Sequence, residues 1–380
     1  MIKIVFITTS LTTGGAELML LKLLRHFDRQ HFDLHVISLR SSGDVGKSIE
    51  ALGIPVLALN MNPGLLNPLK VLCLVKYLLN IKPDLVQTWM YHSDLLGGIA
   101  ARLVGCQRVV WGLRNSNLNE KLTKRSTLMV AKTCAALSSW LPAQILSCST
   151  RAAEIHARAG YQIDKIQVIP NGFDLERFQP NETARLDVRL ELGLMPETPL
   201  VGLIARYDPQ KNHVGFTEAA AIIRHSIPDV HFVLAGGGVN DSNVSLQELI
   251  RKHQLNKCTH LLGRRDDIPR LMASLDVLVS SSSFGEAFPN ILGEAMACAI
   301  PCVVTDVGDS AFIVGATGRV VQVADIAGLA HAVCDLIKMP KQQRLMLGIL
   351  ARERIANFFE IGSVVRNYEK FYSSLAVSTI

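Results

Sequence analysis

Short runs of apolar residues recur along the chain and alternate with segments whose apolar residues are spaced as on one face of a helix. Short runs that are apolar throughout are typical of strands buried on both faces of a parallel sheet. In the first half of the chain we predict strands at 3–8, 32–39, 55–59, 84–88, 108–113, 145–148 and 166–169. After a polar segment the alternation restarts, and we predict strands at 200–205, 230–235, 260–262, 276–280, 302–305 and 319–321.

This repeated alternation predicts an α/β protein with two Rossmann-like, doubly wound domains. Beyond the last predicted strand the pattern is helical at 341–356 and again at 361–374. We expect the final helix to cross back to the first domain. The predicted domains are therefore 1–175 with 358–380, and 176–357.

Composition supports a globular protein. A chain of 380 residues exceeds one ordinary hydrophobic core, and 49% hydrophobic with 19% charged residues excludes a disordered chain. No apolar run reaches the roughly 18 residues of a membrane-spanning helix, and the N-terminus leads directly into a strand pattern without a signal peptide. We therefore expect a cytoplasmic protein. The net charge of +6 is too small and dispersed to indicate nucleic acid binding, although it suits a phosphate-bearing substrate.

The eight cysteines do not form a C-x-x-C pair, and several lie within apolar segments. They are expected to be buried, reduced thiols. Cys298 and Cys302 are close in sequence, but no nearby cysteine or histidine pair completes a metal-ligand set. We predict no metal site.

Two glutamates follow the predicted strand 276–280. Glu286 precedes a helix and Glu294 lies inside it, at the edge of the sheet where open α/β folds bind ligands. Retaining glycosidases hold their two carboxyls about 5.5 Å apart, and these two are expected to be too distant to flank one bond. They could instead hold two hydroxyl-bearing groups joined by an anionic linker, since the helix N-terminus near Asn290 and Ile291 attracts phosphate. Sugar, diphosphate and ribose fit this arrangement.

Two further loops carry candidate residues, and each follows the first strand of one domain. Arg206 and Lys211 come after strand 200–205, where an arginine fork and a mobile ammonium can neutralise a diphosphate leaving group. Gly14 and Gly15 come after strand 3–8 and allow the backbone to approach a phosphate or a sugar closely.

These features together resemble the family 4 retaining glycosyltransferases of the GT-B fold. The glutamate segment, from Glu286 to Pro301, is the most specific match. The other matching segments are Gly14–Glu17, Ile169–Phe178, Arg206 with Lys211, Ala235–Gly238, Thr305–Ser310 and Gly315–Gly318. The resemblance implies two Rossmann-like domains facing a central cleft, with the acceptor on the N-terminal side and the nucleotide-sugar donor on the C-terminal side.

The resemblance also implies roles for individual residues. Glu286 would bind hydroxyls of the transferred sugar, and Glu294 the hydroxyls of the ribose. Arg206 and Lys211 would bind the diphosphate. The remaining donor-binding positions would be Gly14, Gly15, Phe288, Asn290 and Ile291, with Gly15, Asn290 and Ile291 contributing backbone groups. The family implies catalysis without a cofactor or a bound metal, with a UDP- or GDP-sugar as substrate.

The chain departs from the family at one position. Many relatives carry a histidine at the end of an N-domain strand facing the sugar, and the matching stretch here offers Arg114. His92 follows the preceding strand and could line the same cleft. Each residue has either a role in catalysis or acceptor binding, or a structural contact in the wall of its domain; the sequence leaves both open.

Other functions remain as alternatives. A nucleotide-sugar epimerase of the same fold would bind the same donor, and a non-catalytic sugar-binding subunit would bind without turnover. Residues 43–48 resemble the end of a phosphate-binding P-loop, but Ser41 stands where that motif requires glycine. Residues 236–238 are glycines after a strand, but they lack the spacing of a dinucleotide-binding motif.

The segment 121–132 combines basic and apolar residues in a predicted helix. Bacterial-type relatives often act on lipid-linked or polysaccharide acceptors at the inner face of the cytoplasmic membrane. We therefore expect peripheral contact with an anionic membrane through Lys121, Lys124 and Arg125. The other interpretation is a packed helix with a solvated face. The sequence identifies neither the sugar, the base nor the acceptor.

Overall fold

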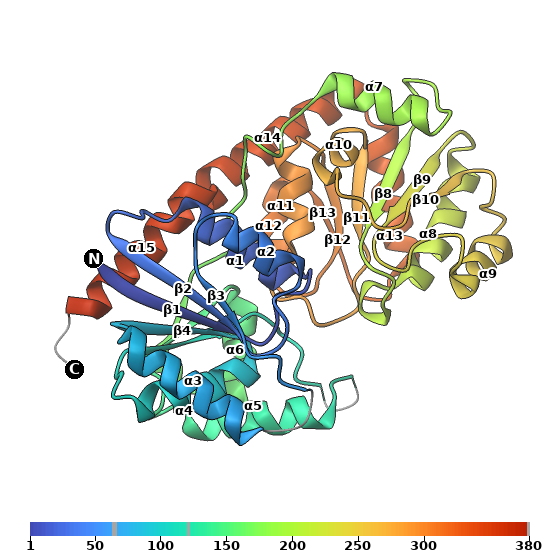
Figure 1. Cartoon of the computed structure of the whole chain (residues 1–380). Coiled ribbons are helices and arrows are strands. Elements are labelled where there is room, and N and C mark those ends of the chain that lie inside the picture. Colours follow the sequence, from blue (N-terminus) through green and yellow to red (C-terminus); the bar gives the residue numbers. More distant parts are fainter. Residues whose placement is uncertain (63–66, 120–121, 378–380) are drawn as a thin grey trace. The chain divides into compact units, whose positions relative to one another are not determined.

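The computed structural model describes residues 1–62, 67–119 and 122–377, and its chain divides into two compact units (Figure 1). Unit 1 consists of Met1–Gly172 and Ile361–Ile380, and unit 2 of Phe173–Glu360. Unit 2 is therefore inserted between two parts of unit 1.

Unit 1 contains a parallel sheet of seven strands within the described residues. Their order is β3-β2-β1-β4-β5-β6-β7, so the direction in which strands are added reverses between β1 and β4. Such a switch point marks the ligand-binding edge of an open sheet. The strands are β1 (Ile2–Thr8), β2 (Phe32–Ser38), β3 (Val56–Ala58), β4 (Leu85–Trp89), β5 (Val109–Leu113), β6 (Gln144–Ser147) and β7 (Ile166–Val168).

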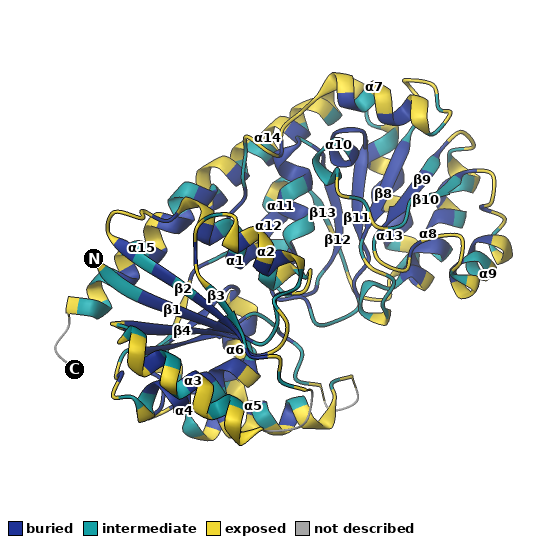
Figure 2. Ribbon diagram, viewed as in Figure 1, coloured by how far each residue is buried: buried dark blue, intermediate teal, exposed yellow. Residues whose placement is uncertain are grey.

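Helices cover both faces of this sheet. One apolar cluster joins α1 and α15 to one face, and another joins α3, α4 and α5 to the opposite face. In Figure 2 the strands are mostly buried, and the helices turn exposed residues outward. The helices are α1 (Gly15–His26), α2 (Gly43–Glu50), α3 (Pro68–Ile81), α4 (Tyr91–Leu103), α5 (Arg125–Leu137), α6 (Thr150–Arg158), η1 (Ile163–Lys165) and α15 (Ile361–Val377).

Unit 2 repeats the arrangement with a parallel sheet in the order β10-β9-β8-β11-β12-β13. Its strands are β8 (Leu200–Ile204), β9 (His231–Ala235), β10 (Thr259–Leu261), β11 (Val277–Ser280), β12 (Cys302–Thr305) and β13 (Arg319–Val321). Its helices are α7 (Glu182–Glu191), η2 (Pro209–Lys211), α8 (His213–Ser226), α9 (Val244–Lys252), α10 (Ile268–Ala273), α11 (Asn290–Ala297), α12 (Ser310–Val314), η3 (Gly315–Thr317), α13 (Ile326–Lys338) and α14 (Lys341–Phe359).

The predicted fold class is confirmed. Both sheets have the Rossmann-like strand order, and each predicted strand overlaps an observed one. The predicted crossover helix is α15, which packs in unit 1. Tyr368 and Tyr372 of this helix are fully buried, and the Tyr372 ring stacks on Phe27 with the ring centroids 6.1 Å apart. The Tyr372 hydroxyl donates to Gln87 Oε1 at 2.9 Å, which fixes α15 to strand β4.

The two ends of unit 2 are joined. The backbone N–H of Phe173 donates to the carbonyl of Phe359 at 2.8 Å, and Phe173 forms an isolated parallel bridge with Glu360. Arg352 of α14 reinforces this contact, because its guanidinium donates to the carbonyls of Leu175 at 3.0 Å and Phe178 at 2.8 Å.

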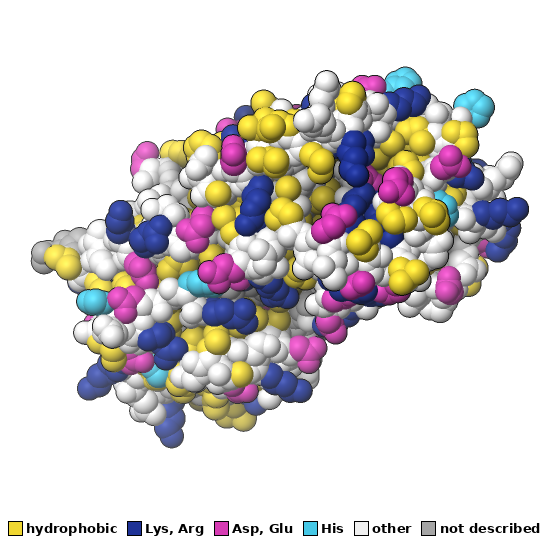
Figure 3. All heavy atoms as spheres, turned by 90° about the horizontal axis from the view of Figure 1, so that it is seen from above, with side chains coloured by type: hydrophobic (Ala, Val, Ile, Leu, Met, Phe, Trp, Pro, Cys, Tyr) yellow, Lys and Arg dark blue, Asp and Glu magenta, His cyan; other side chains and the backbone are white. Residues whose placement is uncertain are grey.

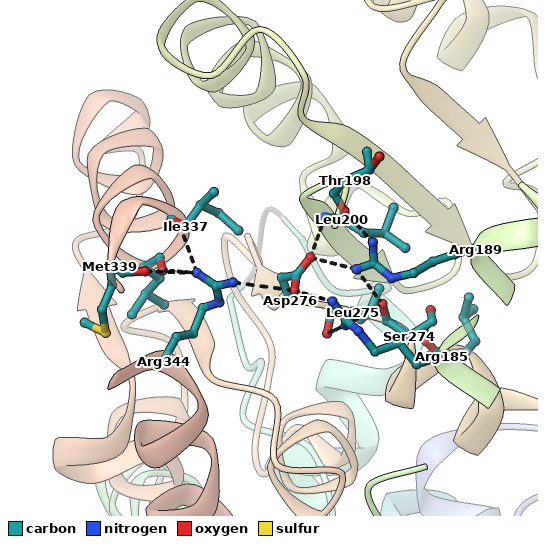
Figure 4. A network of polar contacts seen from close by, with 12 residues as sticks. Arg185, Arg189, Thr198, Leu200, Ser274, Leu275, Asp276, Ile337, Met339 and Arg344 are labelled. Carbon is teal, nitrogen blue, oxygen red and sulfur yellow. Dashed lines mark hydrogen bonds and ion pairs between the residues drawn. The ribbon is translucent and has the colours of Figure 1, made fainter. Parts of the chain in front are cut away.

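A buried carboxylate anchors the amino end of strand β11 (Figure 4). Asp276 accepts from Arg185 at 2.8 Å and from Arg189 at 2.7 Å, two residues of α7. The backbone N–H of Leu200, at the start of β8, also donates to it at 2.8 Å. Arg344 of α14 lies 3.8 Å from the same carboxylate and donates to carbonyls near the end of α13. One carboxylate thus fastens two helices to the sheet.

The P-loop interpretation of residues 43–48 does not fit the structure, because these residues lie inside α2. Gly43 has a φ of 52°, and a Cβ atom on it would lie 2.5 Å from the carbonyl oxygen of Leu11. The N–H of Val45 donates to the same carbonyl at 3.2 Å. The glycine allows close packing against the β1–α1 loop.

On the face of the molecule in Figure 3, acidic and basic side chains are interspersed, which agrees with a dispersed charge. None of the helices in the described ranges combines the length and the apolar character that a membrane-spanning helix requires.

Candidate active site

The loops after β8 and β11 join at the carboxyl edge of the sheet of unit 2. Lys211 ends η2 in the first loop, and its ammonium donates to Oε1 of Glu286 in the second. Ser282 donates to the same oxygen at 2.8 Å. Glu286 is only 7% exposed, and its partner Lys211 is also largely covered. The structure thus brings together two of the predicted site residues as a partly desolvated, hydrogen-bonded ion pair.

Backbone contacts hold the two loops together independently of this ion pair. The Ser281 hydroxyl donates to the carbonyl of Lys211 at 2.9 Å, and the N–H of Ser283 donates to the carbonyl of Gln210 at 2.9 Å. Asn212 follows with a φ of 50°, and its side chain accepts from the N–H of Gly215 to begin α8. Lys211 is therefore fixed from both sides.

The loop after β12 packs against the backbone of the loop that carries Glu286. Gly308 has a φ of 57°, and a Cβ atom on it would lie 2.1 Å from the carbonyl oxygen of Glu286. The N–H of Asp309 donates to the carbonyl of Ala287 at 2.9 Å. The Thr305 hydroxyl donates to the carbonyl of Ser282 at 2.5 Å. The loops after three strands thus position the carboxylate.

Arg206 lies in the same loop as Lys211 but has different partners. Its Nε donates to Asp208 at 3.0 Å and its Nη2 to Gln210 at 3.3 Å. Its side chain is 58% exposed. Partial burial raises the pKa of Asp208, but the Gln210 N–H and the Arg206 guanidinium outweigh burial and leave this pKa below its ordinary value. Arg206 is thus held in the loop with its guanidinium open to solvent.

Sequence reasoning missed two neighbours of the ion pair. Ser282 is one, and the run of serines directly after a strand was the signal available for it. His213 is the other, and its ring is 2% exposed beside Tyr207 with a centroid separation of 5.1 Å. Neither of its ring nitrogens makes a well-formed hydrogen bond among the described residues, although the backbone of Ala205 is near enough to oppose the fall in its pKa. Burial, followed by the charge of Lys211, lowers the pKa of His213 to about 4.

The other predicted donor-binding residues of unit 2 lie in α11 or just before it. Asn290 and Ile291 begin this helix directly after Pro289, which takes the N-cap position. Glu294 is half-buried further along the same helix. The Phe288 side chain is buried between Phe173 and Phe359, with ring centroids 6.2 and 5.6 Å away. Its ring therefore belongs to the core of unit 2.

The glycine loop of unit 1 begins α1, with Gly14 at the N-cap and Gly15 as the first helical residue. The carboxylate of Glu17 folds back over this loop, because a Cβ atom on Gly14 would lie 2.3 Å from Glu17 Oε2. Burial raises the pKa of Glu17, and a backbone hydrogen bond opposes this shift. The space beside Gly14 is thus taken by an acid of the same helix.

Arg114 and His92 both follow strands of unit 1 but differ in their surroundings. The Arg114 guanidinium donates to Asn171 at 3.1 Å and to the Tyr368 hydroxyl at 2.6 Å. It also stacks on the Trp89 ring, 3.7 Å from the centroid. His92 lies in the first turn of α4 and is exposed. Arg114 is thus held by three side chains, whereas His92 faces solvent.

The described residues contain no group of three or more His, Cys, Asp or Glu side chains suited to a metal ion. Each of the eight cysteines is a free thiol, and all except Cys73 are buried, as predicted.

The chain matches known families over most of its length. Residues 13–177 match the model of "Glycosyltransferase Family 4", and residues 198–339 match that of "Glycosyl transferases group 1". One curated relative is the UDP-Gal:alpha-D-GlcNAc-diphosphoundecaprenol alpha-1,3-galactosyltransferase of Escherichia coli. It is 29% identical over 398 aligned positions, which cover 99% of this chain and 98% of the relative.

Solved structures show the same fold. Anabaena Alr3699/HepE in complex with UDP and glucose superposes with a TM-score of 0.87 at 24% identity, covering 98% of this chain and all of that one. WaaG, a glycosyltransferase involved in lipopolysaccharide biosynthesis, gives a TM-score of 0.75 at 15% identity, covering 97% of this chain and 99% of that one. The family matches, the full-length relative and the shared fold together show that the chain belongs to the family 4 glycosyltransferases of the GT-B fold.

Proposed function

We propose that the protein is a retaining glycosyltransferase that moves a sugar from a UDP-sugar to an acceptor hydroxyl on a lipid-linked or polysaccharide intermediate of surface glycan assembly. The observation that carries this proposal is the Lys211–Glu286 ion pair at the ligand-binding edge of unit 2. It sets a hydrogen-bond acceptor for sugar hydroxyls next to a cation for phosphate. The Escherichia coli relative, whose name specifies UDP-Gal, and HepE, solved with UDP and glucose, support a UDP-sugar donor over a GDP-sugar.

In this proposal unit 2 binds the donor. Glu286 accepts hydrogen bonds from the sugar, Lys211 and Arg206 neutralise the diphosphate, and Glu294 accepts from the ribose. Asn290 and Ile291 contribute backbone groups, and Phe288 contributes packing beneath the site instead of a direct side-chain contact.

Transfer with retention would occur by attack on the same face. The acceptor oxygen bonds to the anomeric carbon as the bond from that carbon to the diphosphate oxygen breaks. The acceptor proton passes to the leaving phosphate. Lys211 and Arg206 stabilise the charge that grows on the diphosphate. With this positive charge supplied by the chain, we propose that turnover requires neither a metal nor a cofactor.

Unit 1 would bind the acceptor. His92 is exposed at the carboxyl edge of the sheet and is suited to contact it. Arg114 is held by Tyr368, Asn171 and Trp89, which favours a role in shaping the wall of unit 1 over direct catalysis. The acceptor of the Escherichia coli relative is a sugar on diphosphoundecaprenol, and we propose an acceptor of the same lipid-linked diphosphate class.

A lipid-linked acceptor would bring the protein to the inner face of the cytoplasmic membrane. A groove of about 750 Å³ lies along α5, lined by Arg125, Met129 and Lys132 among others, and Met129 is 68% exposed. Lys121 lies outside the described residues. Vesicles with anionic lipid should bind the protein, and charge reversal at Lys121, Lys124 and Arg125 should weaken that binding. Equal sedimentation of the wild-type protein and the charge-reversed variant with the vesicles would show that α5 is a solvated helix.

A donor screen tests the proposal directly. UDP- and GDP-sugars are compared by thermal shift, and then by UDP or GDP release in the presence of a sugar diphosphate lipid. The expected result is stabilisation by one UDP-sugar and acceptor-dependent release of UDP. Conversion of the donor without acceptor would indicate an epimerase, and binding without any turnover would indicate a non-catalytic subunit.

A further inference from the structure

The ends of three strands meet around Thr9 in unit 1. The N–H of Arg40, two residues past β2, donates to the carbonyl of Thr9 at 3.1 Å. The Thr9 hydroxyl shares a hydrogen bond of 2.9 Å with the hydroxyl of Ser93 in the first turn of α4. Ser93 also donates to the carbonyl of Trp89 at 3.0 Å. Arg40 and the start of α4 are thereby fixed to the same residue of the β1 loop.

Two nitrogen-bearing side chains extend from this junction. Arg40 and His92 are both exposed, and no ion pair or side-chain hydrogen bond involves either of them within the described residues. Their two segments are brought together by the contacts to Thr9, and the charge of Arg40 contributes, after burial, to a lowered pKa of His92. A guanidinium with five donors and an imidazole are therefore both exposed at this junction, and neither has a carboxylate partner among the described residues.

Hydroxyl groups surround this patch. Ser10 and Thr12 share a hydrogen bond of 3.1 Å, and the N–H of Thr12 donates to the Ser10 oxygen at 3.2 Å. Thr9 adds a half-buried hydroxyl, which the buried Ser93 holds in place. An arginine fork accompanied by hydroxyl donors matches the geometry of phosphate oxygens better than that of a neutral sugar.

The backbone beside His92 is strained. Met90 has a φ of 82°, a value that a residue other than glycine rarely adopts. Its N–H donates to the carbonyl of Gly112 at 3.0 Å, and its carbonyl accepts from the N–H of Asp94 at 2.9 Å. Strain that the surrounding structure maintains is concentrated at functional sites. The strained turn at Met90 is therefore consistent with a functional role for the placement of His92.

We propose that Arg40 and His92, with the hydroxyls around Thr9, form an anion site in unit 1 that binds the diphosphate of the lipid-linked acceptor. This inference rests on the proposed function for the identity of the acceptor. The donor diphosphate has its own cations, Lys211 and Arg206, in unit 2. A second cationic site on a different sheet serves a second anionic group, and the acceptor is the substrate that carries one.

Calorimetric titration with inorganic pyrophosphate in saturating UDP tests the site without any turnover, because UDP occupies the phosphate site of unit 2. The wild-type protein should bind pyrophosphate under these conditions. The Arg40→Ala variant should lose at least about tenfold in affinity, as expected for one strong charge-assisted contact, and His92→Ala should bind more weakly than wild type. Arg25→Ala removes an exposed arginine from the last turn of α1 and should bind as wild type does.

Kinetics identify the source of the phosphate. Arg40→Ala should raise the KM for a sugar diphosphate lipid analogue about tenfold, while the KM for the same sugar on a neutral alkyl glycoside and the affinity for UDP stay unchanged. Pyrophosphate binding that is equal in Arg40→Ala and wild type would overturn the site. A pyrophosphate site that is lost in Arg40→Ala without any effect on the acceptor KM would overturn its assignment to the acceptor. Failure of the wild-type protein to bind UDP or any UDP-sugar would instead count against the proposed function.

Discussion

The ammonium of Lys211 donates to Glu286 Oε1, although the two residues are 75 positions apart in the chain. The pair unites the loops after β8 and β11, and Ser282 shares the same carboxylate oxygen. The carboxylate therefore fixes the position of the ammonium before any ligand binds. Such preorganised charge is worth more in a partly desolvated site than in water.

Replacement of Lys211 tests this arrangement. Lys211→Ala should lower kcat/KM for transfer by about 100-fold or more, because it removes a cation expected to act on the leaving diphosphate. UDP release in the presence of acceptor measures the effect. Lys252→Ala removes an exposed lysine at the end of α9 and should keep full activity. Full transfer by Lys211→Ala would refute the assignment of the site.

Gly308 packs against the backbone of Glu286. Its replacement should affect activity only by displacing Glu286. Gly308→Ala places a methyl group 2.1 Å from the Glu286 carbonyl oxygen, so the loop must move. Gly193 is the matched control, since it has a φ of 69° and no atom within 4 Å of an added Cβ.

Both alanine variants strain a left-handed backbone at a cost of about 1 to 2 kcal/mol. Only Gly308→Ala should also lower kcat/KM for transfer, by about tenfold or more, because the moved loop displaces Glu286. Thermal unfolding and kcat/KM measured on the same samples separate the two effects. Equal activity in the two variants would show that Glu286 tolerates a moved loop.

The strands were predictable because buried parallel strands consist of short runs of apolar residues. The observed bounds of β12 and β13 are the predicted ones. The location of Lys211, Glu286 and Arg206 at the carboxyl edge of the sheet was also predictable, since each follows a strand. Their partners were not. The Ser282 hydrogen bond and the Arg206–Asp208 contact depend on loop conformation, which local sequence does not determine.

Other features required the tertiary structure. Asp276 was predicted as the first residue of a strand, and nothing in its neighbourhood indicates three arginines from distant helices. The glycines of 43–48 suggested phosphate binding, whereas Gly43 allows close packing against Leu11. Phe288 lies within the most specific motif, yet its ring belongs to the core.

Asp276 should be important for the stability of unit 2. Burial raises its pKa, but the charges of Arg185 and Arg189 outweigh burial and lower it. Asp276→Asn leaves the buried arginines without their counter-charge and should cost about 3 to 5 kcal/mol of unfolding free energy. Urea denaturation measures the loss. Asp241→Asn, at an exposed aspartate of the same unit, should change stability by less than about 0.5 kcal/mol, and a similarly small change at Asp276 would contradict this prediction.

Acid should destabilise unit 2 through His213. Its pKa is about 4 in the folded protein because the ring is buried, and near 6.5 when the chain unfolds. The unfolded state therefore binds the proton first, and stability falls as the pH drops from 6.5 towards 4, by on the order of 3 kcal/mol in total.

His213→Phe removes this titration while retaining a buried ring. The difference in unfolding free energy between pH 7.5 and pH 4.5 should be smaller in the variant than in the wild-type protein. Urea denaturation at the two pH values provides the comparison. Identical pH dependence in both proteins would assign the acid sensitivity to other groups.

The insertion of unit 2 into unit 1 affects how the protein is synthesised. Helix α15 contributes Tyr368 and Tyr372 to the core of unit 1, but it leaves the ribosome only after the whole of unit 2. The sheet of unit 1 must wait, with the α15 side of its core uncovered, while all of Phe173–Glu360 is translated. Unit 2 is one continuous segment of the chain, so it can complete its fold first. The order of folding on the ribosome is thus expected to be the reverse of the order in which the two sheets begin.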